Sequence, residues 1–482
     1  MRKKIVAVLA AALMLFSAFG ALTGCANSKK TITIVLLTNQ DERSFYIQYF
    51  KDMEKELKEE GHDYKLKFNG YETGDYYNYL GGALQRNDVP DIFYLRPNEI
   101  MQYKNHIVSL QDFADEYGDP ANENSIANLS DIYENALNMY RYNATTGELG
   151  NPNDPLYAFP KDLSVQQLGY NVAFLKRFEE EIKAEGHTMP WDMKFDEGKT
   201  YTWDEYLEIC QIIEKSENKK DDEFASDVPS VEILARSFAA DPTAANAGAL
   251  IDLSNGRKNG KVNDIAKADS PIKKAIEYQA RLTDCGAANY ENATFTNFTA
   301  GKVGFYGLTA SWEISQYNSN LGEGNWEIMP WPTVDGGANW YGLITSAGYV
   351  VSKKAAGMEK GNIAKRIAMS FMSDRTQERM VEEAKICIPL RKSVESAYRN
   401  SANNSKYSPS TRGFYVDVIK GTHGFFPAKY STYDEAWLDK LSDALAAMWN
   451  EGKNGYWKKY ESTKWADIQE EMQTQYDLSK ND

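Results

Sequence analysis

The sequence predicts an α/β protein whose chain passes between two interwoven lobes, and three observations carry this prediction. Segments with the patterns of strands and helices alternate between residues 32 and 116. Residues 141–160, rich in Asn, Gly and Pro, then lead into a crossing toward another lobe, and residues 386–390 look like a crossing back. The 482 residues, 42% of them hydrophobic, suffice for two or three domain cores. No internal repeat or long linker occurs, so consecutive independent domains are not expected.

The first lobe is expected to hold a doubly wound parallel sheet. Residues 32–37 form a continuous apolar and β-branched run, the pattern of a strand buried on both faces. The next apolar positions recur at helical spacing: Tyr46, Phe50, Met53 and Leu57. The alternation continues with a strand at 64–68, a helix at 76–85, a strand at 89–95 and a helix at 107–116. This order places helices on both faces of a parallel sheet.

The remaining chain mixes helices and strands, as expected for a second lobe and its returns. A helix is expected at 172–185, and Thr202 with Glu205 forms a capping box that opens a helix through residue 213. Further strands are expected at 303–307, 326–332 and 348–352, and further helices at 365–373, 377–384, 437–448 and 465–476. The lobes are therefore expected at residues 31–158 plus 347–388 and at residues 159–346 plus 389–482.

The amino terminus has the layout of a bacterial lipoprotein signal. Three basic residues precede an almost wholly apolar run from Ile5 to Leu22, and small residues then precede Cys25. We expect residues 1–24 to be removed, Cys25 to carry a lipid and residues 26–30 to act as a spacer. The alternative is an uncleaved membrane helix, because the apolar run approaches the shortest transmembrane length. The expected location is the extracellular side of the bacterial cytoplasmic membrane.

Composition and missing motifs exclude several functions. Lys and Arg total 54 against 69 Asp and Glu, and the net charge of −15 argues against nucleic acid as a partner. The four Cys and four His show neither C-x-x-C nor H-E-x-x-H spacing, so no metal site and no cofactor are expected. Phosphate-loop, dinucleotide and nucleophile-elbow motifs are also missing. A hydrolase that uses two carboxylates leaves no such signature and stays open.

Several short motifs, in order along the chain, resemble one family. They are the lipoprotein-like start, the polar turn 39–41 after the first strand, Val89-Pro90-Asp91-Ile92, Tyr157-Ala158-Phe159-Pro160 with Gly169-Tyr170-Asn171, Thr202-Trp203-Asp204-Glu205, Gly301-Lys302-Val303-Gly304-Phe305 with Trp312, and Gly348-Tyr349-Val350-Val351-Ser352. Together they resemble family 1 extracellular solute-binding proteins, the sugar receptors of bacterial ABC importers related to maltose-binding protein. The resemblance implies a periplasmic-binding-protein-like fold with two α/β lobes, hinge crossings and a ligand cleft between the lobes.

The resemblance also implies polar ligand contacts in the first lobe and at the crossings. Asn39, Gln40 and Asp41 leave the first strand where ligands of open α/β sheets sit, although turning the chain and capping a helix would explain them too. Arg96 and Asn98, beside Glu99, follow the third strand and are expected to contact the ligand in the same way. A surface salt bridge is the alternative explanation for Arg96. Contacts are also expected from three charged residues at the crossings: Lys161, Asp162 and Arg391. Helix-end pairing or hinge packing explains these three equally well.

Aromatic residues are the expected stacking partners of sugar rings. They make up 13% of the chain, with 31 Tyr and 10 Trp, more than a core alone requires. Trp312 follows the returning strand, at a position where the family commonly stacks an aromatic ring on a sugar. The alternative is that Trp312 is a buried core residue. Trp340 and Tyr341 lie in one Gly-rich loop and Trp331 in the loop before it, and we expect at least one of them to face the ligand.

The function implied is that of a lipid-anchored receptor that binds an oligosaccharide and delivers it to an ABC transporter permease. The partners expected are the sugar, the permease subunits and the membrane through the lipid on Cys25, with the receptor itself a monomer. The motion expected is a change from open to closed lobes, without covalent chemistry or catalytic residues. The alternatives are a secreted glycoside hydrolase, a peptide receptor and a surface adhesin or sensor with the same fold.

Overall fold

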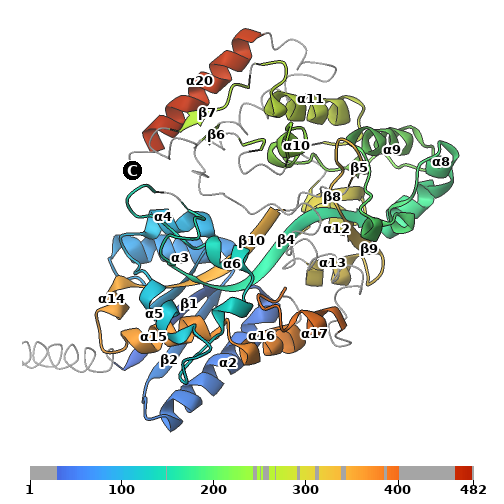
Figure 1. Ribbon diagram of the computed structural model, residues 1–482. Coiled ribbons are helices and arrows are strands. Elements are labelled where there is room, and N and C mark those ends of the chain that lie inside the picture. Colours follow the sequence, from blue (N-terminus) through green and yellow to red (C-terminus); the bar gives the residue numbers. More distant parts are fainter. Residues whose placement is uncertain are drawn as a thin grey trace, which may run out of the picture.

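The computed structural model describes residues 30–479 apart from 148, 243–246, 250, 253–259, 266, 290–293, 310–313, 338–342, 385–387 and 401–461 (Figure 1). The expected signal segment, Cys25 and the helix expected at 437–448 lie outside these residues. A sheet with strand order β2-β1-β3-β10-β4-β8-β5, joined by β9 on β4, runs through both halves of the molecule. The expected mixed α/β architecture is confirmed.

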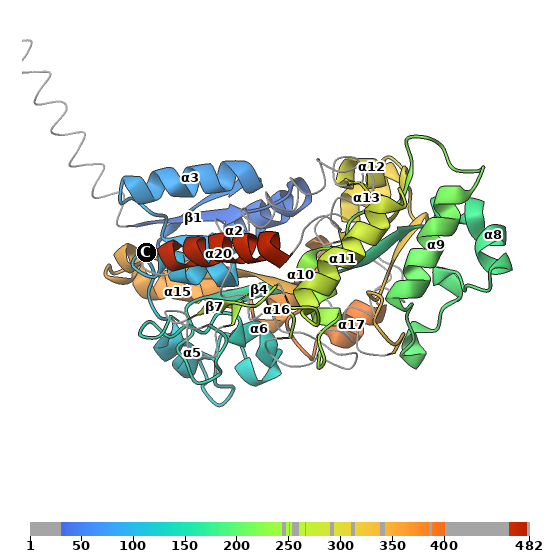
Figure 2. The same cartoon turned by 90° about the horizontal axis from the view of Figure 1, so that it is seen from above.

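The first lobe has the doubly wound parallel arrangement that the sequence predicts. Strands β1 (Thr31–Leu37), β2 (Lys65–Tyr71) and β3 (Ile92–Leu95) are parallel to one another, with β1 between the other two. Helix α2 (Gln40–Glu59) connects β1 to β2, and α3 (Thr73–Gln85) connects β2 to β3. Seen from above, α3 lies on one side of β1 and α15 (Gly361–Ser370) on the other (Figure 2). The helix expected at 107–116 is shorter, because Ile107 pairs with Ser352 and α5 spans Gln111–Tyr117.

Two long antiparallel strands connect the halves. Strand β4 (Phe159–Asn171) pairs with β10 (Leu343–Val351), and β10 also pairs with β3 of the first lobe (Figure 1). Beyond β10, β4 continues into the second lobe, where it pairs with β8 (Val303–Thr309) and β9 (Trp326–Met329). A third passage comes close to β4 at Ile388, which forms a bridge with Leu163. The chain therefore crosses between the halves through paired strands.

The second lobe surrounds the far end of β4 with helices. Strand β5 (Phe224–Ser226) is parallel to β8, and the hairpin of β6 (Ile251–Asp252) and β7 (Lys261–Val262) lies under α20 (Ser462–Ser479). The helices are α7 (Val172–Leu175), α8 (Glu179–Ala184), α9 (Trp203–Lys215), α10 (Val231–Ser237), α11 (Pro271–Asp284), α12 (Phe295–Thr299) and α13 (Ile314–Asn320). The predicted capping box of α9 is confirmed: Thr202 Oγ1 accepts from the Glu205 N–H at 3.0 Å, and Glu205 Oε2 accepts from the Thr202 N–H at 2.7 Å.

The last described helices before residue 401 return to the first lobe. They are α14 (Lys353–Ala356), α15, α16 (Asp374–Arg379), a π-helical turn at Met380–Ala384 and α17 (Glu395–Asn400), while α4 (Ile100–Tyr103) and α6 (Glu134–Asn138) lie earlier in the chain. Helix α15 ends at Ser370, before the expected residue 373, because the Ser373 hydroxyl accepts from the Thr376 N–H and starts α16.

Buried side chains form two clusters. One is centred on β1, β3 and β10 and extends to α12 and α13, and the other lies beneath α9, α10 and α11. Leu390, Val394 and Tyr398 belong to the first cluster, which also contains Phe298 and Tyr317 of the expected second lobe. The clusters therefore do not separate the lobes, and the expected lobe boundaries stay a prediction. Among the described residues, no helix is long and apolar enough to cross a bilayer.

Candidate ligand site between the lobes

The strand register brings the carboxyl ends of both sets of parallel strands to one stretch of β4. Strand β3 ends at Leu95, which pairs with Gly348, and Gly348 also pairs with Pro160 of β4. Further along β4, Gln167 pairs with Thr309, the last residue of β8. The first-lobe strands therefore end toward β4 from one side, and β8 with its parallel neighbour β5 ends toward it from the other. Open α/β sheets bind ligands at such carboxyl ends.

In the second lobe, Asp227 follows the carboxyl end of β5. Its Oδ2 accepts a hydrogen bond from the Gly307 N–H of β8 at 2.9 Å, whereas its buried Oδ1 has no hydrogen-bond partner among the described residues. Burial raises the pKa of Asp227 to about 7, and the bond from Gly307 lowers it only in part. A carboxyl group with this pKa can accept a hydrogen bond or, when protonated, donate one.

Two further polar side chains of the second lobe have unused hydrogen-bonding capacity. Gln167 is fully buried, and neither its amide oxygen nor its amide nitrogen has a partner in the described part of the chain. Glu232, at the start of α10, has a buried Oε1 without a partner there, and burial raises its pKa to about 7. Because buried polar groups almost always have partners, unpaired groups at strand ends indicate a place for water or ligand.

In the first lobe, Asn39 and Glu42 organise the turn after β1. The Glu42 N–H donates to Asn39 Oδ1 at 2.8 Å and the Asn39 N–H donates to Glu42 Oε2 at 3.3 Å, which makes a capping box for α2. The Asn39 Nδ2 and the Thr38 Oγ1 are buried and have no hydrogen-bond partner among the described residues. Asn39 thus caps α2 through its Oδ1, while its Nδ2 makes no hydrogen bond within the described part of the chain.

Lys161 and Asp162 of β4 form a buried charge cluster with Glu42. The Lys161 Nζ lies 2.9 Å from Glu42 Oε1 and 2.8 Å from Asp162 Oδ2, with 5% of its side chain exposed. Burial by itself lowers the pKa of Lys161, but Asp162 and Glu42 raise it well above its ordinary value. Asp162 Oδ1 also accepts from the Ala347 N–H at 3.3 Å. The ammonium group therefore joins α2 to the crossing strands, as hinge packing would require.

Helix α16 holds the same part of β4. The Gln377 Nε2 donates to the Lys161 carbonyl oxygen at 2.8 Å, and its Oε1 accepts from the Leu390 N–H at 2.8 Å. The hydroxyls of Tyr46 on α2 and Tyr349 on β10 are 2.9 Å apart. Side chains of the first lobe therefore connect β4, β10 and the segment at Leu390 at the point where the lobes meet.

The family comparison agrees with this arrangement. A model of the family described as bacterial extracellular solute-binding protein matches residues 49–406. This protein is a bacterial extracellular solute-binding protein. The match covers most of both lobes and includes both long crossing strands, so the resemblance inferred from sequence is confirmed.

Solved structures show the fold of this solute-binding protein. It is 14% identical to the maltose-bound MalE3 of T. maritima, with a TM-score of 0.64 over 92% of this chain and 99% of the other. An ABC substrate-binding protein from Listeria monocytogenes in complex with cycloalternan is 13% identical, with a TM-score of 0.63 over 92% and 98%. The cyclic alpha-maltosyl-1,6-maltose binding protein of Arthrobacter globiformis is 13% identical, with a TM-score of 0.60 over 93% and 98%. A comparison with curated proteins found no match.

The predicted aromatic contacts of the solute-binding protein have different outcomes. Trp312, Trp340 and Tyr341 lie outside the described residues. Trp331 is 1% exposed and packs against Trp203, with 6.4 Å between ring centroids, and a Cβ placed on Gly307 would meet its ring at 2.5 Å. In this arrangement Trp331 is a core residue. The expectation that at least one of the three loop aromatics faces the ligand therefore stays a prediction for Trp340 and Tyr341. Gly307 on β8 leaves the space that the Trp331 ring fills.

Arg96 lies among tyrosines that the sequence interpretation missed. Its Cζ is 5.4 Å from the centroid of the Tyr77 ring, and its N–H donates to Glu99 Oε2 at 2.6 Å. The Tyr77 hydroxyl is buried without a partner among the described residues, and burial together with Glu99 raises its pKa. The adjacent pair Tyr76–Tyr77 on α3 was the available signal. Tyr77 thus supplies an aromatic group beside Arg96.

A second pair of tyrosines lies at the carboxyl end of β2. Tyr71, the last residue of this strand, stacks on Tyr79 of α3 with 5.2 Å between centroids and 22° between planes. The Thr38 N–H donates to the Tyr71 carbonyl oxygen at 2.8 Å, which places the pair beside the turn after β1. The position of Tyr71 at the end of a strand is visible in the sequence. Its stacking on Tyr79 is not, because this contact depends on how α3 packs against the sheet.

Gln40, Asp41, Asn98 and Arg391 complete the predicted set. The backbone of Gln40 and Asp41 begins α2 and that of Asn98 lies in a short 3₁₀ turn, but their side chains are outside the description. Arg391 is 2% exposed, pairs with Asp131 at 2.8 Å and with Asp374, and donates to the Met372 carbonyl oxygen at 3.0 Å. Its contacts are those of a buried structural residue, the hinge-packing alternative. No group of potential metal ligands occurs among the described residues.

Proposed function

We propose that this protein is a receptor that captures an oligosaccharide between its lobes and delivers it to an ABC transporter permease. The observation that carries the proposal is the convergence of strand carboxyl ends from both lobes on residues 160–167 of β4. Polar groups on both sides of this stretch have no hydrogen-bond partner among the described residues. Three of the similar solved structures are described as binding maltose, cycloalternan or a cyclic maltosyl-maltose. Such ligands are neutral and carry many hydroxyls that these groups can bond.

The proposed cycle is a change between open and closed lobes. A ligand that contacts both lobes favours the closed arrangement, because all of its contacts are made only there. First-lobe contacts are assigned to Asn39, Arg96 and Tyr77, and second-lobe contacts to Gln167 and Asp227. Trp312, Trp340 and Tyr341 are proposed as stacking partners of the sugar rings. The permease then recognises the closed arrangement through the outer surfaces of both lobes.

The first experiment is thermal unfolding of the full-length protein with malto-, xylo-, manno-, galacto- and fructo-oligosaccharides and their monomers. A ligand at about 100 times its dissociation constant adds about 2.7 kcal/mol to the free energy of unfolding, which raises the melting temperature by a few degrees. We expect one sugar class to raise it and to be recovered intact. If none of the sugars raises the melting temperature, the proposal of a sugar receptor is contradicted. If a sugar is recovered in cleaved form, a hydrolase is favoured.

A stacking role for Trp312 is tested with the sugar that gives the shift. Trp312→Ala is expected to weaken binding by about tenfold or more while the unliganded melting temperature stays unchanged. The matched control is Trp191→Ala, since Trp191 lies in a short 3₁₀ turn of the second lobe and packs on Tyr170. Equal affinity of Trp312→Ala and wild type, measured by calorimetry, would contradict the assignment.

We also propose that Cys25 carries a diacylglyceryl group that holds the receptor at the membrane. The small residues before Cys25 and the polar run after it support this proposal. Cys25→Ser is expected to leave an unprocessed precursor or to release the protein into the medium, measured by membrane fractionation and mass spectrometry of the amino-terminal peptide. Lipidation that persists in this variant would rule out Cys25 as the acceptor.

A further inference from the structure

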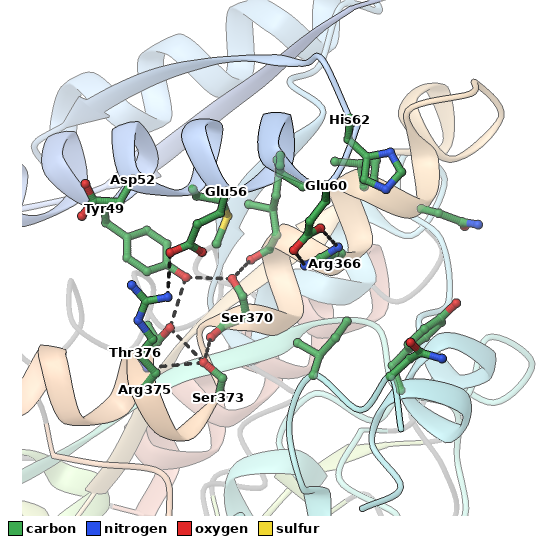
Figure 3. Close-up of a pocket in the computed structure, with 18 of the residues that line it drawn as sticks. Tyr49, Asp52, Glu56, Glu60, His62, Arg366, Ser370, Ser373, Arg375 and Thr376 are labelled. Atoms are coloured by element: carbon green, nitrogen blue, oxygen red, sulfur yellow. Dashed lines mark hydrogen bonds and ion pairs between the residues drawn. The ribbon is translucent and has the colours of Figure 1, made fainter. Parts of the chain in front are cut away.

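A cavity lies in the first lobe, apart from the strand ends. It has a volume of about 690 Å³ and lies between α2, α15, α16 and residues 124–126 after α5 (Figure 3). The α2 residues that line it begin at Tyr49, whereas Asn39, at the boundary between the lobes, caps the start of that helix. This volume is within the range of cavities that bind small molecules. We name it the α2–α15 groove.

One wall of the groove is a ladder of ion pairs. Asp52, Glu56 and Glu60 recur every fourth residue and so share one face of α2. Figure 3 shows Arg375 opposite Glu56 and Arg366 opposite Glu60. The pairs are Glu60–Arg366 at 2.5 Å, Glu56–Arg375 at 2.6 Å and Asp52–Arg379 at 3.3 Å. The Glu60 and Arg366 side chains stay 43% and 39% exposed. Arg379 is shared with Glu383, whose Oε1 lies 3.0 Å from its Nε. Each arginine of the wall thus has a carboxylate partner, and partly exposed pairs such as Glu60–Arg366 keep donor and acceptor positions free for further hydrogen bonds.

Hydroxyl groups line another part of the groove. The Tyr49 hydroxyl is 2.8 Å from Ser370 Oγ and 3.2 Å from Thr376 Oγ1, and the Ser373 hydroxyl donates to Thr376 Oγ1 at 2.9 Å (Figure 3). Hydroxyls both donate and accept, so this network can rearrange around a polar guest. They carry no charge and suit a ligand with hydroxyls of its own.

The remaining wall is apolar. Phe113 and Tyr117 of α5 pack with 4.4 Å between ring centroids and 31° between planes, and Met53 and Ile363 lie in the same lining. Flat aromatic and aliphatic surfaces bury the C–H faces of a sugar ring or a similar polyol. The groove thus combines an apolar wall with paired charges and hydroxyls.

We propose that the α2–α15 groove is a second ligand site, which binds a neutral, polyhydroxylated small molecule. An anion bound by the arginines, or a cation bound by the carboxylates, would displace an existing ion-pair partner. A neutral polyol leaves all three pairs intact and uses their open positions together with the hydroxyls. The site is independent of the ligand between the lobes, so each site can be tested without the other.

The test follows the methyl resonance of Met53 in NMR spectra of full-length protein with isotope-labelled methionine. Met53 lines the groove, and its signal is assigned as the one missing from Met53→Leu. The probes are maltotriose, xylotriose and raffinose, with citrate and spermidine as charged comparisons. We expect a saturable shift with at least one neutral probe and none with the charged ones. A resonance unmoved by all three sugars, or moved only by a charged probe, overturns the proposal.

A matched pair of variants locates the binding. Asn362→Trp places an indole on a lining residue of α15 and is expected to abolish the Met53 shift, while sugar binding between the lobes, measured by calorimetry, persists. The same substitution at exposed Asn78 of α3, outside the groove lining, should leave the shift unchanged. A Met53 shift that survives in Asn362→Trp assigns the binding elsewhere and overturns the site. Failure of the receptor proposal would instead remove the calorimetric signal and leave the Met53 result standing.

Discussion

Lys161→Met is expected to destabilise the protein by about 3–5 kcal/mol, measured by chemical denaturation near neutral pH. The substitution keeps much of the apolar stem and removes the charge between Glu42 and Asp162, both at least 85% buried at their side chains. Two carboxylates would then share a buried site without a cation. The loss should shrink in acid, because protonation of Asp162 removes one of the unpaired charges. The same change removes the ion pair that joins α2 to β4, whereas the contact between the Tyr46 and Tyr349 hydroxyls remains.

The control for this prediction is Lys354→Met. Lys354 pairs with Asp88 at 2.7 Å, but the two side chains are 53% and 66% exposed, so the expected cost is about 1 kcal/mol or less. Equal effects of the two substitutions would show that burial of the Lys161 cluster does not determine its energy. A Lys161→Met protein as stable as wild type would show that its carboxylates are satisfied without the ammonium.

Stability is expected to fall as the pH rises toward and above neutrality, and Asp227→Asn should remove part of that fall. Asp227 has a pKa of about 7 in the folded protein, above its ordinary value of 3.8, so the folded state binds the proton more tightly. The associated stability is complete below about pH 4 and is lost as the pH rises through about 7. Between about pH 5 and about pH 8, the contribution of this one group amounts to about 2–3 kcal/mol.

The measurement compares the free energy of unfolding of wild type with that of Asp227→Asn, at about pH 5 and again at about pH 8. Asn keeps an oxygen that can accept from Gly307, so the variant should fold and show a smaller decrease. Glu232 has a similar pKa and supplies a remaining part of the decrease. Asp221→Asn, at an exposed position, is the matched control and should follow wild type. An unchanged pH dependence in Asp227→Asn would show that this carboxyl group is solvated.

Much of the secondary structure could be predicted because it depends on residues near one another in sequence. The stripe of apolar residues in α2 and the capping box at Thr202 act within one or two turns of helix, and both are present. The burial of Trp331, in contrast, depends on a residue 24 positions away in sequence. The residues next to Trp331 in sequence suggest an aromatic in an exposed loop. The ring is buried because Gly307, on β8, has no side chain and leaves space for it.

The sequence by itself determined the α/β class, the strand–helix order of the first lobe and the membership of a solute-binding family, because periodicity, caps and motifs are local properties. The tertiary structure alone decided which charges meet. Lys161 lies 119 positions from Glu42, and Arg366 lies 306 positions from Glu60, so neither pairing has a signal in the local pattern. The same packing places the Gln167 amide and the Asp227 Oδ1, which have no hydrogen-bond partner among the described residues, near the strand ends. Local interactions select elements, whereas burial over long separations selects the partners that form a site.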